Sequence, residues 1–170
     1  MNGKKLRRMV TAALCAALCC TATMVIRVPS PTGGYKNLGD CFVLVSAWLL
    51  GPWWGGAAAG IGSALSDLFS GYAYYVPGTL LVKGLMAVVA ALLYRPLSAR
   101  SPLAASVVSG LAGAAIMVAG YFGYATLVLG KWESAGVSAL GNVVQGGIGL
   151  CTAVVLWAFL RRSRILEQTL

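Results

Sequence analysis

Residues 102–129 read PLAASVVSGLAGAAIMVAGYFGYATLVL and contain no charged side chain. An α-helix needs about 20 apolar residues to cross the hydrocarbon core of a bilayer, so this segment is long enough to span a membrane. The whole chain has the same character: 59% of its 170 residues are apolar and 10% are charged, against about 25% charged residues in soluble domains. Because so few charges cannot cover a soluble surface of this size, the composition predicts an integral membrane protein.

Further apolar segments lie on both sides of this one and are separated by clusters of turn residues. We predict an all-α bundle of six transmembrane helices, forming one membrane domain over residues 1–170, with helices at approximately 5–28, 36–50, 53–70, 78–94, 102–129 and 134–160. A cluster of Pro, Ser, Thr and Gly at residues 29–34 ends the first helix. The second helix is barely long enough to cross, and an apolar segment of about 10–14 residues can also be re-entrant.

Basic residues gather at the ends of the apolar segments. The three clusters are Lys4, Lys5, Arg7 and Arg8; Arg95 and Arg100; and Arg161, Arg162 and Arg164. Cytoplasmic loops carry such an excess of Lys and Arg. Six crossings place all three clusters on one side, whereas five would place the last cluster outside, so we expect both termini in the cytoplasm. These loops also account for the net charge of +9, and a nucleic-acid surface is not expected.

Polar side chains within the predicted helices fall in the outer half of the membrane. They recur at helical spacing as Ser63, Asp67 and Ser70; Thr79 and Lys83; and Ser138, Asn142 and Gln145. Buried polar groups are costly in a bilayer and often mark functional sites. We therefore predict an outward-opening pocket built from Asp67, Lys83, Asn142 and Gln145. An alternative stays open, in which Asp67 and Lys83 form a structural ion pair and the two amides hydrogen-bond between helices.

Most tyrosines belong to the same outer side: Tyr35, Tyr72, Tyr74, Tyr75, Tyr121 and Tyr124. Aromatic belts form at membrane interfaces, but a belt should occur on both faces. The excess on one side favours rings that stack on a flat heterocyclic ligand. We expect Tyr35, Tyr72 and Tyr75 to be stacking or gating groups of the pocket.

The sequence lacks the residues and motifs that several kinds of functional site require. It has no histidine, its five cysteines fall mostly within apolar segments, and neither a zinc site nor a disulfide framework is expected. P-loop and serine-nucleophile motifs are absent as well. We therefore predict no catalytic residue, metal or cofactor, and a binding site whose energy source is a partner. The alternative is a small membrane enzyme with Asp67 and Lys83 as an acid/base pair, or a structural membrane subunit without a transported ligand.

Much of the chain resembles the S components of energy-coupling factor (ECF) transporters, especially those for riboflavin, pyridoxine or hydroxymethylpyrimidine. The resemblance is carried by GYKNLGD at 34–40, by residues 56–67, by SGY at 70–72, by PGTLLVKG at 77–84, by GNVVQG at 141–146 and by the alanines of the first helix. It implies a six-helix subunit that binds a small planar vitamin or vitamin precursor at the outer face, under the loop after the first helix. Asn37, within the first of these stretches, joins the expected ligand-binding residues.

The resemblance also implies partners and a location. S components work with a membrane T component and two ATPase subunits in the bacterial plasma membrane, where ATP drives uptake. In that family the alanine ridge of the first helix contacts the T component, which here implies docking through Ala12, Ala13, Ala16 and Ala17. Their small-xxx-small spacing allows close approach of two helices. Because the inner half of every predicted helix is apolar, we expect the ligand to cross only when the whole subunit reorients.

Overall fold

The structure, a computed structural model, describes residues 3–29 and 35–163. Residues 30–34 of the predicted turn cluster at 29–34 and Arg164 lie outside these residues. The elements are α1 (Gly3–Val25), β1 (Arg27–Pro29), β2 (Tyr35–Asn37), α2 (Asp40–Phe69), the 3-10 helix η1 (Ala73–Tyr75), α3 (Val76–Ser98), α4 (Pro102–Gly123), the π-helix η2 (Tyr124–Val128) and α5 (Trp132–Arg162).

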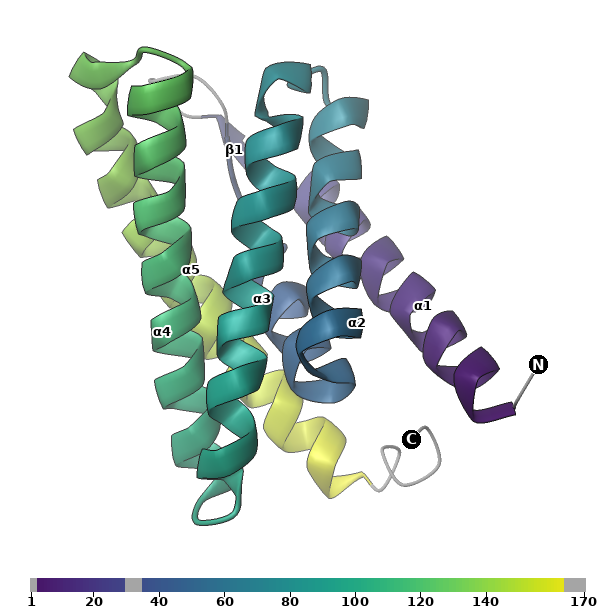
Figure 1. The fold of residues 1–170 in the computed structure, drawn as a ribbon. Coiled ribbons are helices and arrows are strands. Elements are labelled where there is room, and N and C mark those ends of the chain that lie inside the picture. The colour runs from purple at the N-terminus through teal and green to yellow at the C-terminus, as the bar shows by residue number, and fades with distance from the viewer. Residues whose placement is uncertain (1–2, 30–34, 164–170) are drawn as a thin grey trace.

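The long helices form a single elongated bundle, with α1 leaning away from it at its N-terminal end (Figure 1). By length and composition, five helices of the described residues are able to cross a membrane: α1, α2, α3 together with η1, α4 together with η2, and α5. The prediction of an all-helical membrane bundle is therefore confirmed. The predicted number of six is not confirmed, because the segments expected at 36–50 and 53–70 form one element, α2.

Helix α2 is interrupted at Gly51, whose φ of 80° and ψ of −174° lie in a region that is essentially restricted to glycine. The chain reverses direction here, so that residues 40–50 run down and residues 52–69 run up in Figure 1. A Cβ atom at Gly55 would lie 2.6 Å from the carbonyl oxygen of Ser46, whereas residues 46 and 55 of a straight helix lie about 13 Å apart along its axis. Pro52 suits the start of the second half, where its missing N–H leaves no helical bond unmade.

The first half of α2 lies at the centre of the bundle. Its side chains Val43, Leu44 and Ala47 are almost fully buried. Large apolar side chains of the other helices face outward instead, among them Leu81, Leu85, Leu111, Leu140 and Val155. Lipid tails are as apolar as leucine, so outward leucines and an interior of small and polar residues are the arrangement expected of a bundle in a bilayer.

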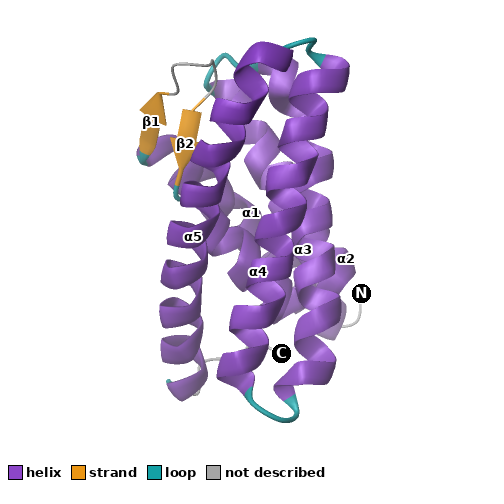
Figure 2. Cartoon of the chain, turned by 90° about the vertical axis from the view of Figure 1, so that its left-hand side faces the viewer, coloured by secondary structure: helices purple, strands orange, loops and turns teal. Residues whose placement is uncertain are grey.

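A short antiparallel hairpin follows α1, with Val28 opposite Lys36. The first helix therefore ends earlier than the predicted residue 28, and the next begins later than the predicted residue 36. Proline at position 29 disfavours the helical conformation at Val28, which accounts for the early end. The hairpin lies beside α5 near the end of the bundle that holds the loops after α2 and α4 (Figure 2).

Candidate ligand-binding site

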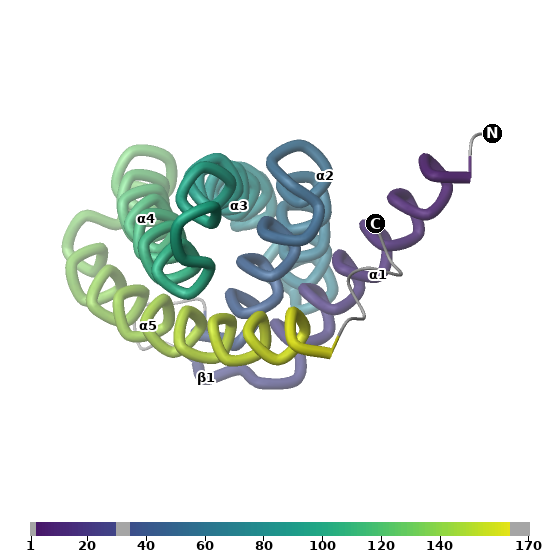
Figure 3. Tube along the Cα trace, turned by 90° about the horizontal axis from the view of Figure 1, so that it is seen from below, coloured from purple at the N-terminus to yellow at the C-terminus, as the bar shows by residue number. Residues whose placement is uncertain are grey.

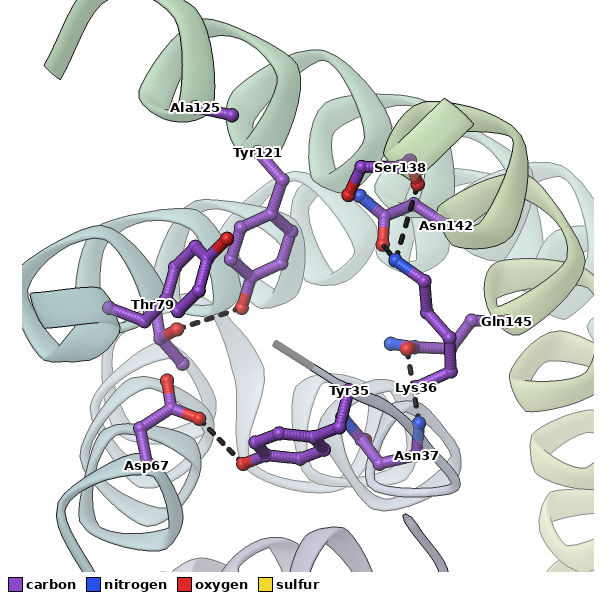
Figure 4. Close-up of a pocket in the computed structure, with 11 residues that line it drawn as sticks. Tyr35, Lys36, Asn37, Asp67, Thr79, Tyr121, Ala125, Ser138, Asn142 and Gln145 are labelled. Atoms are coloured by element: carbon purple, nitrogen blue, oxygen red, sulfur yellow. Dashed lines mark hydrogen bonds between the residues drawn. The ribbon is translucent and has the colours of Figure 1, made fainter. Parts of the chain in front are cut away.

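A cavity of about 50 Å³ lies between β2 and the outer turns of the helices (Figure 4). Its lining residues are Tyr35, Lys36, Asn37, Asp67, Tyr75, Thr79, Tyr121, Ala125, Ser138, Asn142 and Gln145. They come from β2, α2, η1, α3, α4, η2 and α5, so nearly every element contributes. The polar faces that the sequence placed at one depth do meet around a common space.

Two phenols close one side of the cavity. Tyr35 donates a hydrogen bond of 2.6 Å to Asp67 Oδ1, and Tyr121 donates one of 3.0 Å to Thr79 Oγ1. The Tyr35 phenol therefore serves as the donor in its contact with the carboxylate.

The opposite side is formed by contacts between β2 and α5. The Lys36 ammonium donates to Asn142 Oδ1 at 2.6 Å and to the Ser138 carbonyl oxygen at 3.2 Å. The backbone N–H of Asn37 donates to Gln145 Oε1 at 3.1 Å. These three hydrogen bonds hold the hairpin over the cavity.

Lys83, which the sequence placed in the pocket, does not line it. Its ammonium is buried and forms an ion pair with Asp40, and Gln145 Nε2 donates to the other oxygen of that carboxylate at 2.8 Å. This is the single salt bridge within the part of the chain that the structure describes. The proposed pair of Asp67 and Lys83 is therefore wrong, because the lysine side chain reaches inward to the first half of α2.

Six of the eight predicted ligand-binding residues line the cavity: Tyr35, Asn37, Asp67, Tyr75, Asn142 and Gln145. Tyr72 lies behind it, with its ring centroid 5.0 Å from that of Tyr35. Lys36 and Tyr121 were missed as site residues. Thr79 and Ser138 were visible as members of polar helix faces, and Lys36 stands in the GYKNLGD stretch, so those signals were present in the sequence.

The described residues contain no group of three His, Cys, Asp or Glu side chains that could hold a metal ion. The cavity instead combines phenol rings, side-chain amides, one carboxylate and one ammonium group. Such groups bind by stacking and directed hydrogen bonds.

A family model described as the S component of the ECF-type riboflavin transporter matches residues 3–162. The chain belongs to this family. An uncharacterised protein of Pyrococcus woesei is 32% identical to this S component over 132 residues, which cover 74% of the chain and 86% of the relative. The solved structure of the S component of a bacterial ECF transporter covers 94% of this chain and 95% of its own, with a TM-score of 0.64 and 16% identity. That likeness shows a shared fold.

The resemblance inferred from the sequence is thus confirmed. The family is one of substrate-binding subunits of ECF importers, multi-pass membrane proteins that associate with T and ATPase components and a small-molecule substrate.

The alanines of α1 in this S component divide between two faces. Ala12 is buried and packs in a cluster with Cys15 and Ala58, and a Cβ atom at Gly62 of α2 would overlap the carbonyl oxygen of Ala16. Ala13 and Ala17 are exposed. Of the four predicted docking alanines, Ala13 and Ala17 are therefore the most open to another protein in this structure, whereas Ala12 is buried and Ala16 is half-buried.

Proposed function

We propose that this S component binds riboflavin or a related planar vitamin or precursor, such as pyridoxine or hydroxymethylpyrimidine. It acts with a T component and two ATPases for ATP-driven uptake across the bacterial plasma membrane. The observation that carries the proposal is the cavity in which tyrosine rings face side-chain amides. The matching family is described as that of the riboflavin transporter, which favours riboflavin among these ligands.

The lining suits a flat, uncharged ring system with polar edges. Tyr35, Tyr75 and Tyr121 offer ring surfaces, and Asn142 and Gln145 offer both donors and acceptors for ring carbonyl and N–H groups. The carboxylate of Asp67 accepts from Tyr35 and has further acceptor sites for a ring N–H or hydroxyl group of the ligand.

Ligand entry requires the hairpin to move. Pockets for ligands of this size measure about 300–1,000 Å³, whereas this cavity measures about 50 Å³. The Lys36 side chain occupies space beside Asn142 that a ligand would need. The hairpin is held by hydrogen bonds to Asn142, Ser138 and Gln145. A ligand that forms hydrogen bonds with the same three residues would replace those of the hairpin, so that opening costs little free energy.

Replacing Asn142 by leucine should weaken riboflavin binding by at least about fivefold, since a buried hydrogen bond lost to a ligand costs about 1–3 kcal/mol. The measurement is a titration of the purified S component, followed by quenching of riboflavin fluorescence. Val144→Leu is the matched control, because Val144 is exposed on the outer face of the same helix and its affinity should equal that of the native chain. If the Asn142→Leu variant bound riboflavin as tightly as the native chain, Asn142 would not be a ligand-binding residue.

We further propose six crossings with both termini in the cytoplasm. The half-helix 40–50 is about 16 Å long and covers half of a bilayer core of about 30 Å. Strand β2 precedes it and would complete the crossing through the outer half. Non-helical backbone is tolerated at that depth where it lines a cavity, as β2 does here.

The inner half of the bundle is sealed, which supports movement of the whole subunit as the route of transport. The rings of Trp48, Tyr94 and Trp157 pack with centroid distances of 5.8 Å. All three side chains are buried. Substrate held in the outer cavity would reach the cytoplasm by reorientation of the subunit against its T component.

The exposed alanine face of α1 is our proposed docking surface for the T component. Ala13→Trp or Ala17→Trp should abolish uptake and co-purification with the T component, because a bulky ring prevents close helix approach. Riboflavin binding by the isolated subunit should be unchanged. Ala16→Trp is the comparison, and it should impair folding as well, because Ala16 packs against Gly62. Normal complex formation by both Ala13→Trp and Ala17→Trp would exclude this face.

A further inference from the structure

Two hollows lie one above the other between α4 and α5, apart from the ligand cavity, and are called here the lower and upper parts of a groove. Its lower part is a hollow of about 430 Å³ lined by Ser101, Pro102, Leu103, Ser106, Val154, Trp157, Ala158, Arg161 and Arg162. Its upper part, about 610 Å³, is lined by apolar residues and glycines of the same two helices, between Leu111 and Phe122 on α4 and between Ala139 and Leu150 on α5. Roughly one helical turn separates the two parts, given a rise of about 1.5 Å per residue.

The shape of the groove follows from the sequence and from the course of α5. Seen from below, α5 crosses the bundle obliquely, and its last turns lie away from α4 (Figure 3). The upper part is lined by Ala114, Ala115, Ala119, Gly146 and Gly147, among others. A Cβ atom at Gly147 would meet no atom within 4 Å. Small side chains that usually let helices pack together here leave a trough open to the surroundings.

The lower end of the groove carries Arg161 and Arg162, and no acidic side chain of the described residues lies beside them. Arg161 is held in place by a 3.0 Å hydrogen bond from its Nη1 to the Tyr94 hydroxyl, which leaves its other N–H groups available. Within residues 3–29 and 35–163, neither Arg161 nor Arg162 has a salt bridge. The acidic residues of this part are Asp40, Asp67 and Glu133. Asp40 is paired with Lys83, Asp67 lies in the ligand cavity, and Glu133 begins α5 at its opposite end.

We propose that this groove binds an anionic phospholipid. The headgroup phosphate lies between Arg161 and Arg162, and an acyl chain follows the apolar trough toward Gly147. Basic pockets between transmembrane helices on the cytoplasmic side have the charge that acidic headgroups require. The planar guanidinium forms paired hydrogen bonds with phosphate, and the trough supplies apolar contact along about one leaflet.

Native mass spectrometry of the full chain, extracted in detergent and incubated with phosphatidylglycerol or phosphatidylcholine, tests the proposal. The native chain should retain phosphatidylglycerol and not phosphatidylcholine. Arg161→Gln and Arg162→Gln should each lower its retention by about fivefold. Arg100→Gln is the matched control, because Arg100 is an exposed basic residue before α4 that does not line the groove, and its retention should equal that of the native chain.

Gly147→Leu tests the acyl-chain part separately. A Cβ atom at Gly147 would meet no atom within 4 Å, and the rest of a leucine side chain would extend into the trough, so the variant should unfold at the native temperature in a thermal scan and still lose the lipid. Equal retention of the two lipids, or equal losses for Arg100→Gln and Arg161→Gln, would overturn the proposal. If Gly147→Leu retained the lipid as the native chain does but no longer co-purified with the T component, the groove would be a protein interface instead.

Discussion

Lys83→Met should destabilise this S component by about 3–5 kcal/mol, because removal of one partner leaves a buried charge without compensation. The ammonium of Lys83 and the carboxylate of Asp40 are 3% and 0% exposed. The pair joins α3 to the first half of α2, and Gln145 connects it to α5. Loss of the cation would leave the Asp40 carboxylate with the Gln145 amide in the centre of the bundle.

A double-mutant cycle measures this effect as a coupling. Lys83→Met, Asp40→Asn and the double variant are compared by denaturant unfolding in mixed micelles. The double variant should be more stable than Lys83→Met alone, because no charge is then left unpaired. Lys5→Met is the control, since Lys5 is exposed and its replacement should change stability by less than about 0.5 kcal/mol. Simple addition of the two single effects would show that the pair is not coupled.

Gly51→Ala should destabilise the fold by at least about 1–3 kcal/mol, because its backbone conformation is nearly closed to other residues. A Cβ atom there would also overlap the guanidinium of Arg95. That group lies against the end of the half-helix 40–50, where carbonyl oxygens carry partial negative charge. The substitution therefore strains the backbone at the point where the chain reverses between the two halves of α2.

Gly136→Ala is the matched control for this substitution. Gly136 lies within α5, and a Cβ atom there would meet nothing within 4 Å. Alanine at that position should leave the unfolding temperature unchanged or raise it slightly. Equal stability of Gly51→Ala and Gly136→Ala would mean that the chain does not reverse at Gly51 as described.

The sequence was informative about the helices and about the depth of the site. Uncharged segments of sufficient length predicted most of the spanning helices, because a bilayer imposes that length. Polar residues at helical spacing predicted that Asp67, Asn142 and Gln145 would meet. These inferences need only periodicity within one helix and a common depth in the membrane.

Other features depend on contacts between distant segments, which periodicity cannot supply. The partner of Lys83 is Asp40 on the first half of α2, and spacing alone favoured Asp67, which lies closer along the chain. The hairpin that places Lys36 over the cavity depends on the pairing of β1 with β2. The reversal at Gly51 makes one element of two predicted helices, and no local pattern distinguishes such a tight turn from a short loop.

The central claim is that this S component binds a planar vitamin in its outer cavity. Native mass spectrometry of the purified chain, incubated with an equimolar panel of vitamins and precursors, tests it most directly. We predict one retained ligand per chain, with the mass of riboflavin or of a closely related planar heterocycle, and loss of that ligand in Asn142→Leu. Retention of none of the panel would contradict the account, and so would a ligand that Asn142→Leu binds as tightly as the native chain.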